Sequence, residues 1–334
     1  MRPITALAAS ILAVLTAASA HAEATRLRVA KQYGLGYVQL MMMEDAKLVE
    51  KHAKAAGLGD VAVEWSTFRS SDVVNDALIS GNLDFASLGP TAIVTLWSRT
   101  RGSMDVRVAS GLNAMAWMLN VRDSRIKSIR DFTENDRIAV PAVKVSGQAT
   151  ALEIAAAKEW GIESYDKLDK LTVSLAHPDA TAMMLGVPSE IVANFSSPPY
   201  ECIQKKDARI RTILTSDDIL GGPISFNVLA TTKRFRDDKP KLFKAFLDAL
   251  EEATAAVNKD KEAAAEVYAR MSGDKTPKAE IVTMMNDKTS HFTTETLGLG
   301  AFTDFMAKVG RVKVAPKDWR TDLLFPEAQA RLGR

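Results

Sequence analysis

The chain has 334 residues, of which 47% are hydrophobic and 25% are charged, and its formal net charge is +2. This composition is that of a globular protein. The small net charge argues against a protein that binds nucleic acid or an anionic membrane surface. The single cysteine, Cys202, excludes an intrachain disulfide. The four histidines are far apart in the sequence, so we expect no metal site.

The first 22 residues have the features of a secretory signal peptide. A basic start at Arg2 is followed by an apolar run over residues 4–18 and by the small-residue pattern Ala20-His21-Ala22. The apolar run is too short to cross a bilayer, and the A-x-A pattern predicts cleavage after Ala22. We therefore expect an exported, periplasmic protein that begins at Glu23.

Three β-α units follow the signal peptide. The predicted strands, residues 27–30, 61–65 and 83–86, each lead through a polar or glycine-bearing loop into a helix. Gly81 suits the left-handed turn that ends a helix, and Pro90 suits the first turn of the next one. A β-α-β-α-β order predicts a parallel sheet with crossover helices. Such sheets bind ligands at the carboxyl ends of their strands, where all three loops lie.

The same patterns predict the ends of one long helix and the two segments in which the chain crosses between lobes. One helix is expected over residues 39–56, and a crossing into a second lobe is expected over residues 111–115. The second lobe repeats the β-α pattern, and Gly222 marks the return crossing. We therefore predict an α/β protein of two lobes, each a mostly parallel sheet flanked by helices. Lobe I comprises residues 23–113 and 222–334, and lobe II comprises residues 114–221.

Several short segments carry a family resemblance through their order and spacing. They are residues 27–30 with the tyrosine-glycine loop, 63–68, 81–86, 126–132, 145–147, 196–200 and 230–235. In this order the chain resembles the substrate-binding proteins of ABC importers for nitrate, sulfonates and taurine. The resemblance covers nearly the whole mature chain and implies the type 2 periplasmic binding protein fold, with one small ligand in the cleft between the lobes. It also implies delivery of that ligand to a membrane permease and its ATPase.

The loops that match this family supply the expected ligand-binding residues. In the first lobe they are Gln32, Tyr33, Tyr37, Arg69, Ser70, Ser71, Gly89, Pro90 and Thr91. In the second lobe they are Ser146, Gly147, Gln148, Ser196, Ser197 and Pro198. Two aromatic residues are added from their positions beside these loops. Phe195 is expected to line an apolar part of the site, and Trp117 is either a core residue or a wall of the cleft.

The expected ligand is a small anionic or polar organic molecule. Arg69 either forms a bidentate contact with a carboxylate or sulfonate or lies at a solvated rim. Hydroxyl groups and helix-start N–H groups can hold an anion without formal charge. Sulfonate-binding relatives have a Trp-Asp-Pro-Tyr run where this chain has Ser197-Pro198-Pro199-Tyr200. The missing aromatic and acidic side chains weigh against an alkylsulfonate or an amino-sulfonate.

The sequence favours a binding protein over an enzyme. It has no G-x-S-x-G elbow, Walker loop or H-E-x-x-H motif, and we expect no cofactor. Two alternatives to an import function remain: a binding protein for a thiamine-pyrimidine precursor, because aromatic walls suit a planar ring, and an exported ligand-sensing module. The expected mechanism is hinge closure of a monomer, in which a ligand that contacts both lobes favours the closed form.

Overall fold

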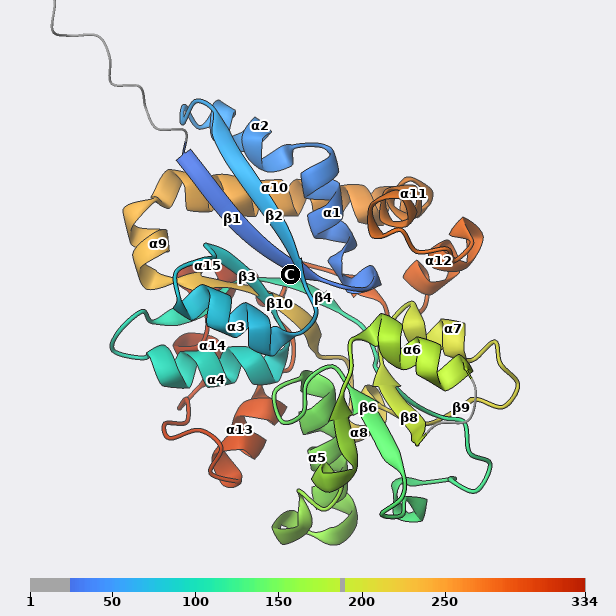
Figure 1. Cartoon of the computed structure of the whole chain (residues 1–334). Coiled ribbons are helices and arrows are strands. Elements are labelled where there is room, and N and C mark those ends of the chain that lie inside the picture. Colours follow the sequence, from blue (N-terminus) through green and yellow to red (C-terminus); the bar gives the residue numbers. More distant parts are fainter. Residues whose placement is uncertain (1–24, 187–189, 334) are drawn as a thin grey trace, which may run out of the picture.

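The computed structural model describes residues 25–186 and 190–333. Two β-sheets lie one above the other, with helices around them (Figure 1). The predicted signal peptide, residues 1–22, lies outside the described residues. In the part of the chain that the structure describes, no helix has the length and hydropathy needed to cross a membrane.

The first sheet has six strands in the order β11-β4-β10-β3-β1-β2. These strands are β1 (Thr25–Gln32), β2 (Val61–Phe68), β3 (Phe85–Leu88), β4 (Val106–Ala114), β10 (Ser225–Thr232) and β11 (His291–Phe292). β1 pairs in parallel with β2 and β3, as the β-α-β-α-β order predicts. β10 runs antiparallel to β3 and β4, and β11 runs antiparallel to β4.

The second sheet has five strands in the order β7-β6-β8-β5-β9. These strands are β5 (Met118–Val121), β6 (Arg137–Val140), β7 (Thr172–Ser174), β8 (Ile191–Ser196) and β9 (Arg211–Thr215). β6 is parallel to β7 and β8, whereas β5 is antiparallel to β8 and β9. Both sheets are therefore mixed, and the prediction of mostly parallel sheets is correct only for β1–β3 and β6–β8. Strands such as β5 and β10 enter from the other sheet, so no crossover helix forces them to run parallel.

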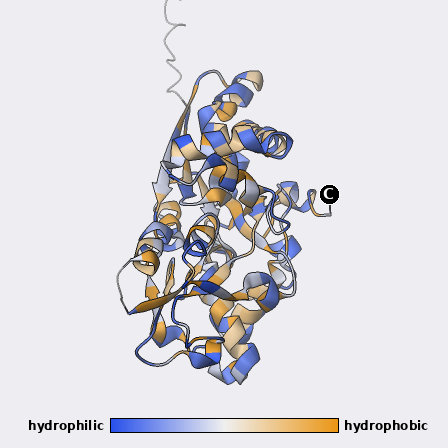
Figure 2. Cartoon of the chain, turned by 90° about the vertical axis from the view of Figure 1, so that its right-hand side faces the viewer, coloured by the Kyte–Doolittle hydropathy of each residue, from blue (hydrophilic) through white to orange (hydrophobic). Residues whose placement is uncertain are grey.

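Helices connect and surround the strands. Those that follow strands of the first sheet are η1 (Leu35–Tyr37), α1 (Val38–Asp45), α2 (Leu48–Ala55), α3 (Ser71–Ile79), α4 (Pro90–Thr100), α9 (Lys233–Asp238), α10 (Pro240–Lys259), α11 (Lys261–Ser272), α12 (Lys278–Met285), α13 (Gly300–Lys308), α14 (Trp319–Asp322) and α15 (Pro326–Gln329). Those that follow strands of the second sheet are η2 (Ile129–Asp131), α5 (Gly147–Trp160), η3 (Ile162–Ser164), η4 (Asp169–Leu171), α6 (His177–Leu185), α7 (Tyr200–Gln204) and α8 (Ser216–Leu220). Many of them combine hydrophobic and hydrophilic residues (Figure 2), as expected for helices with one face against a sheet.

An aromatic cluster joins the C-terminal helices to the first sheet. Phe85 of β3 is fully buried and stacks on Phe246 of α10, with ring centroids 3.8 Å apart. Phe235 and Phe243 pack on the same ring at 5.3 and 6.0 Å. Truncation of a buried phenylalanine costs about 3–5 kcal/mol. The last third of the chain is thus an integral part of the first sheet's core.

Two element boundaries differ from the sequence predictions. Residues 39–56 form two helices, α1 and α2, because Lys47 between them has a left-handed backbone with φ 49°. β4 continues to Ala114, where a crossing was expected, so the crossing to β5 is short. Gly111 lies within this longer β4 and is tightly packed. A Cβ there would lie 1.9 Å from the Glu295 carbonyl oxygen, so glycine lets the 293–295 segment pack directly on the strand.

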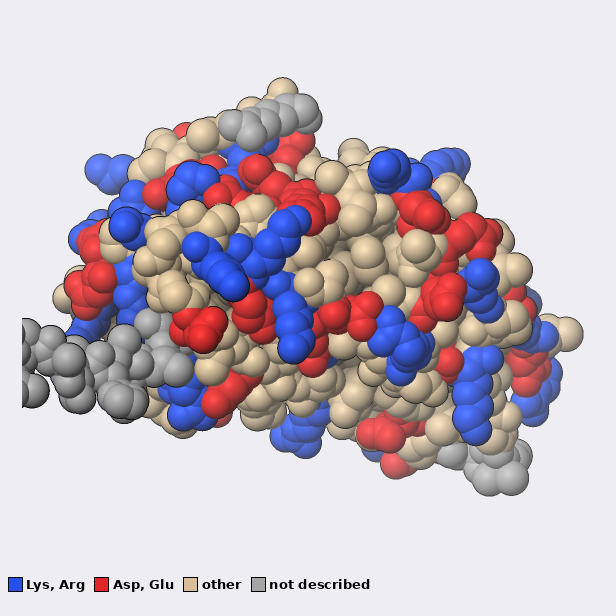
Figure 3. All heavy atoms as spheres, turned by 90° about the horizontal axis from the view of Figure 1, so that it is seen from above, with Lys and Arg blue, Asp and Glu red and all other residues tan. Residues whose placement is uncertain are grey.

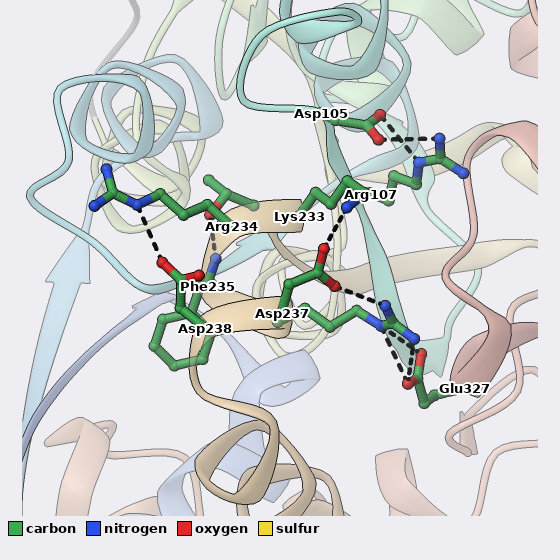
Figure 4. A network of polar contacts seen from close by, with 10 residues as sticks. Asp105, Arg107, Lys233, Arg234, Phe235, Asp237, Asp238 and Glu327 are labelled. Carbon is green, nitrogen blue, oxygen red and sulfur yellow. Dashed lines mark hydrogen bonds and ion pairs between the residues drawn. The ribbon is translucent and has the colours of Figure 1, made fainter.

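Charged residues of both signs are interspersed over the face shown in Figure 3. Many of them form pairs, such as those around α9 in Figure 4. There Arg236 donates from Nε and Nη2 to the Glu327 carboxylate at 2.9–3.1 Å, and Arg234 donates to Asp238 at 3.2 Å. The first of these contacts ties α9 to α15. It therefore holds α15 against the helix that directly follows β10.

Candidate ligand-binding site

Four helices begin at one small cavity, two from each sheet. α3 and α4 follow β2 and β3, and α5 and α6 follow β6 and β7. Ser71, Gly89, Gly147 and His177, which stand at these four helix starts, line the cavity. The free N–H groups and the dipole of a helix start attract negative charge. The cavity therefore has the electrostatic character of an anion site.

The cavity is nearly closed in this conformation. Its volume is about 20 Å³, which is room for about one water molecule. The starts of α4 and α5 touch: a Cβ on Gly147 would lie 2.6 Å from Trp117 and 3.3 Å from Pro90. Glycine at position 147 thus permits the close approach of the two sheets. An organic molecule fits in the cavity only if the walls move apart.

Most of the residues expected from the sequence meet at this cavity. Those that line it are Gln32, Tyr33, Tyr37, Arg69, Ser71, Gly89, Trp117, Ser146, Gly147 and Gln148. Four further lining residues escaped the sequence analysis: Pro141, His177, Phe226 and Asn227. The predicted loops therefore converge, and β10 and the start of α6 complete the wall.

One formal charge faces this cavity. Arg69 is the only lining residue among those described that carries a full charge, and none of the lining residues is acidic. Arg69 is exposed, and within residues 25–186 and 190–333 its side chain has no hydrogen-bond or ion-pair partner. A guanidinium without a partner is available for a bidentate contact with an oxyanion.

Two buried donors of lining residues also lack acceptors. The Tyr37 hydroxyl donates to Asn227 Oδ1 at 3.0 Å. Asn227 Nδ2 and Trp117 Nε1 are buried and reach no acceptor among the described residues. A buried donor left unpaired costs about 1–3 kcal/mol. These donors favour a ligand that brings acceptor oxygens. Trp117 is both core residue and wall, because it is fully buried and also lines the cavity.

His177 links the predicted serines to the cavity. Its Nδ1 lies 3.2 Å from the Ser196 hydroxyl and its Nε2 lies 3.3 Å from the Ser197 hydroxyl. The ring stacks on Tyr200 with centroids 5.5 Å apart. Burial lowers the pKa of His177 to about 4, so the imidazole is neutral at pH 7. Ser196 and Ser197 thus stand behind His177, outside the lining. Pro178, in the first turn of α6, is the sequence feature that could have marked this helix start.

The other predicted residues lie beside the cavity without lining it. Ser70 is the N-cap residue of α3, and its hydroxyl donates to Asp72. Phe195 packs edge-on against Trp117 at 6.4 Å. The Pro198 carbonyl accepts a hydrogen bond from the Leu35 N–H at 2.9 Å. The remaining two, Pro90 and Thr91, are buried in the first turn of α4.

Two mixed sheets with an anion-type cavity at helix starts from both of them define the periplasmic binding protein fold. The alkanesulfonate-binding protein SsuA from Xanthomonas axonopodis pv. citri, bound to MOPS, has a TM-score of 0.68 at 16% identity, over 92% of this chain and 98% of that one. The aliphatic sulphonate binding protein SsuA from Escherichia coli has a TM-score of 0.64 at 17% identity, over 92% and 97%. The nitrate-binding protein NrtA from Synechocystis PCC 6803 has a TM-score of 0.60 at 15% identity, over 87% and 86%. At these identities the likeness concerns the fold.

The chain belongs to the NMT1-like family, whose model matches residues 20–272. No curated protein is similar enough in sequence to count as a match. The resemblance to substrate-binding proteins of ABC importers that the sequence predicts is thereby confirmed at the level of family and fold.

Proposed function

We propose that this protein is the extracytoplasmic solute-binding component of an ABC importer and that it captures a small anion. The observation that carries the proposal is the convergence of four helix starts, two from each sheet, on one cavity that Arg69 also lines. Helix starts and a free guanidinium both stabilise oxyanions. The names of the structural neighbours, which include proteins for sulfonates and nitrate, support the same class of ligand.

The proposed mechanism is hinge closure. The proposed lobe I comprises residues 23–113 and 222–334, and lobe II comprises residues 114–221. Lining residues come from both lobes, so a ligand in the cavity contacts both and favours the closed form by its differential affinity. In the proposed cycle the closed form delivers the ligand to a permease and its ATPase in the membrane.

The lining chemistry narrows the ligand class. An amine-bearing ligand such as taurine needs a carboxylate partner, and no aspartate or glutamate lines the cavity in the described residues. A zwitterion is therefore disfavoured relative to a simple anion. Neutral planar solutes, such as pyrimidines, leave the Arg69 charge without a partner. They are also disfavoured for that reason.

A thermal-shift screen of residues 23–334 tests the proposal. The panel holds nitrate, sulfonates, taurine, small carboxylates and pyrimidines. An anion at 100 times its dissociation constant stabilises the protein by about 2.7 kcal/mol, which raises the melting temperature by several degrees. We expect Arg69→Met to weaken binding of that anion at least tenfold, because a hydrogen bond to a charged group contributes about 1.5–3 kcal/mol.

Arg99→Met is the matched control. Arg99 is exposed in the last turn of the same α4 whose start lines the cavity, so its loss should leave the affinity within about twofold. Equal affinity of wild type and Arg69→Met for the anion would show that Arg69 does not contact the ligand. If a pyrimidine binds and none of the anions does, the alternative function, a binding protein for a thiamine-pyrimidine precursor, would replace the proposal.

A further inference from the structure

An open groove lies next to the closed cavity. Its volume is about 760 Å³, and it runs between the first sheet with α11 and α12 on one side and α6 and α7 on the other. Figure 1 shows α11 and α12 above α6 and α7 at the right of the molecule. Gln32 and Tyr33 line both the groove and the cavity, so the two spaces share a wall.

Tyr33 lies where the groove and the cavity adjoin, because it lines both of them. It is 42% exposed, and its hydroxyl makes no hydrogen bond within the described residues. Beside it, the Leu35 N–H donates to the Pro198 carbonyl at 2.9 Å and joins the two sheets.

The groove has an apolar wall with few unpaired charges. Met41, Leu185, Ile203 and Met271 line it, together with the ring of Tyr200. Lys31 is paired with Glu44, and Lys206 is paired with Glu280. Asp274 and Lys275 contribute one charge of each sign at the turn before α12. Such a wall suits an uncharged apolar or aromatic group rather than a second anionic group.

We infer that this groove is the outer compartment of the ligand site and that the ligand is an organic anion with an elongated apolar or aromatic body. The inference rests on the proposed function and chooses within it: a bare inorganic oxyanion such as nitrate would leave the groove unused. The anionic head sits at the four helix starts, and the body passes Tyr33 into the groove. A groove of about 760 Å³ has the size of a small-molecule site, whereas the cavity of about 20 Å³ holds a head group only when it opens.

The test compares anions that share a head group and differ in length, using residues 23–334. The probes are nitrate, methanesulfonate with hexane-1-sulfonate, and acetate with hexanoate, each titrated by calorimetry. In wild type we expect at least one longer member to bind at least tenfold more tightly than its short partner and than nitrate. Ala182→Trp fills the groove from the exposed face of α6. This variant should bind the longer anion at least tenfold more weakly than wild type does, and its affinity for the short anion should stay within twofold.

Ala255→Trp is the control, because Ala255 is an exposed alanine on α10 outside the groove. It should change neither affinity. Should Ala182→Trp fail to fold, Tyr33→Ala replaces it and should reduce the preference for the longer anion. Equal binding of long and short anions to wild type, or an unchanged preference in the groove variant, would overturn the inference and leave the proposed function standing. Binding of none of these anions would overturn both.

Discussion

The boundary between the two sheets is built differently at its two edges. At the groove edge, the sheets meet through the Leu35–Pro198 backbone hydrogen bond and the exposed ion pair of Lys206 with Glu280. At the packed edge, Trp117 in the crossing to β5 packs against other rings, and a half-buried arginine, Arg311, reaches across to α5. The rings around Trp117 are Phe195, Phe226 and Phe302, with centroids 5.8–6.4 Å away.

The buried carboxylates at the two edges show the same contrast. At the packed edge, Arg311 donates to Glu153 at 2.5 Å and to Thr150 at 3.0 Å. At the groove edge, Glu201 is buried: the Cys202 thiol donates to Oε1 at 3.6 Å, and Oε2 has no side-chain partner among the described residues. Burial raises the pKa of Glu201 to about 8, so this carboxyl is neutral at pH 7. Under the proposed mechanism, the packed edge is the pivot and the groove edge opens.

The largest expected effect is at the packed edge. Arg311→Met leaves the Glu153 carboxylate buried without its cation, which costs about 3–5 kcal/mol. Urea unfolding of the variant and of wild type measures this loss. Lys206→Met at the groove edge is the matched control and should cost at most about 1 kcal/mol, because the pair is exposed. Equal losses in the two variants would contradict the difference between the edges.

An intermediate effect is expected from pH at Glu201. The folded protein holds the Glu201 proton up to about pH 8, whereas the ordinary pKa is 4.5. The contribution to stability is therefore full below about pH 4.5 and is lost as the pH rises to about 8. The slope from one such group is at most about 1.4 kcal/mol per pH unit. In urea unfolding between pH 5 and 8, Glu201→Gln should reduce the slope, and the exposed Glu163→Gln should not. An unreduced slope in Glu201→Gln would show that Glu201 is ionised in the folded state.

The smallest effect concerns the backbone contact of the groove edge. Gly34 has φ 119°, and a Cβ there would lie 3.1 Å from the Pro198 carbonyl oxygen. Gly34→Ala should cost about 1–3 kcal/mol of closed-state stability and give a larger radius of gyration in small-angle scattering. Gly59 also has a positive φ, 73°, but nothing lies within 4 Å of a Cβ there, so Gly59→Ala should lose stability without expanding. If both variants give the same scattering, Gly34 has no role in holding the two sheets closed.

The helix starts of the site could be predicted because their signals are local. Gly89-Pro90 places a cap and a first turn directly after the apolar strand β3, and Ser146-Gly147 does so after a short loop that follows β6. His177 could not be predicted as a lining residue, because its role depends on hydroxyl groups about twenty residues further along the chain. Asn227 reaches the cavity only because β10 returns from the other sheet to pair with β3.

The same limit explains why Ser196 and Ser197 were expected to contact the ligand. Their loop does arrive at the site, but the sequence does not reveal that the His177 ring stands in front of it. Nothing in the sequence indicated the role of Arg311 either. Its partner Glu153 lies far away in the sequence, on a helix whose inward face is set by tertiary packing.

The helix starts around the cavity also decide how the site responds to acidity. The charge that they present belongs to the backbone, which does not titrate. His177 remains neutral above about pH 4. A site made of these groups keeps its affinity for an anion in acidic and in neutral surroundings alike. Under the proposed function the protein works outside the cytoplasm, in surroundings that its cell does not buffer, and there the chemistry of capture would remain constant even while the stability of the fold varies.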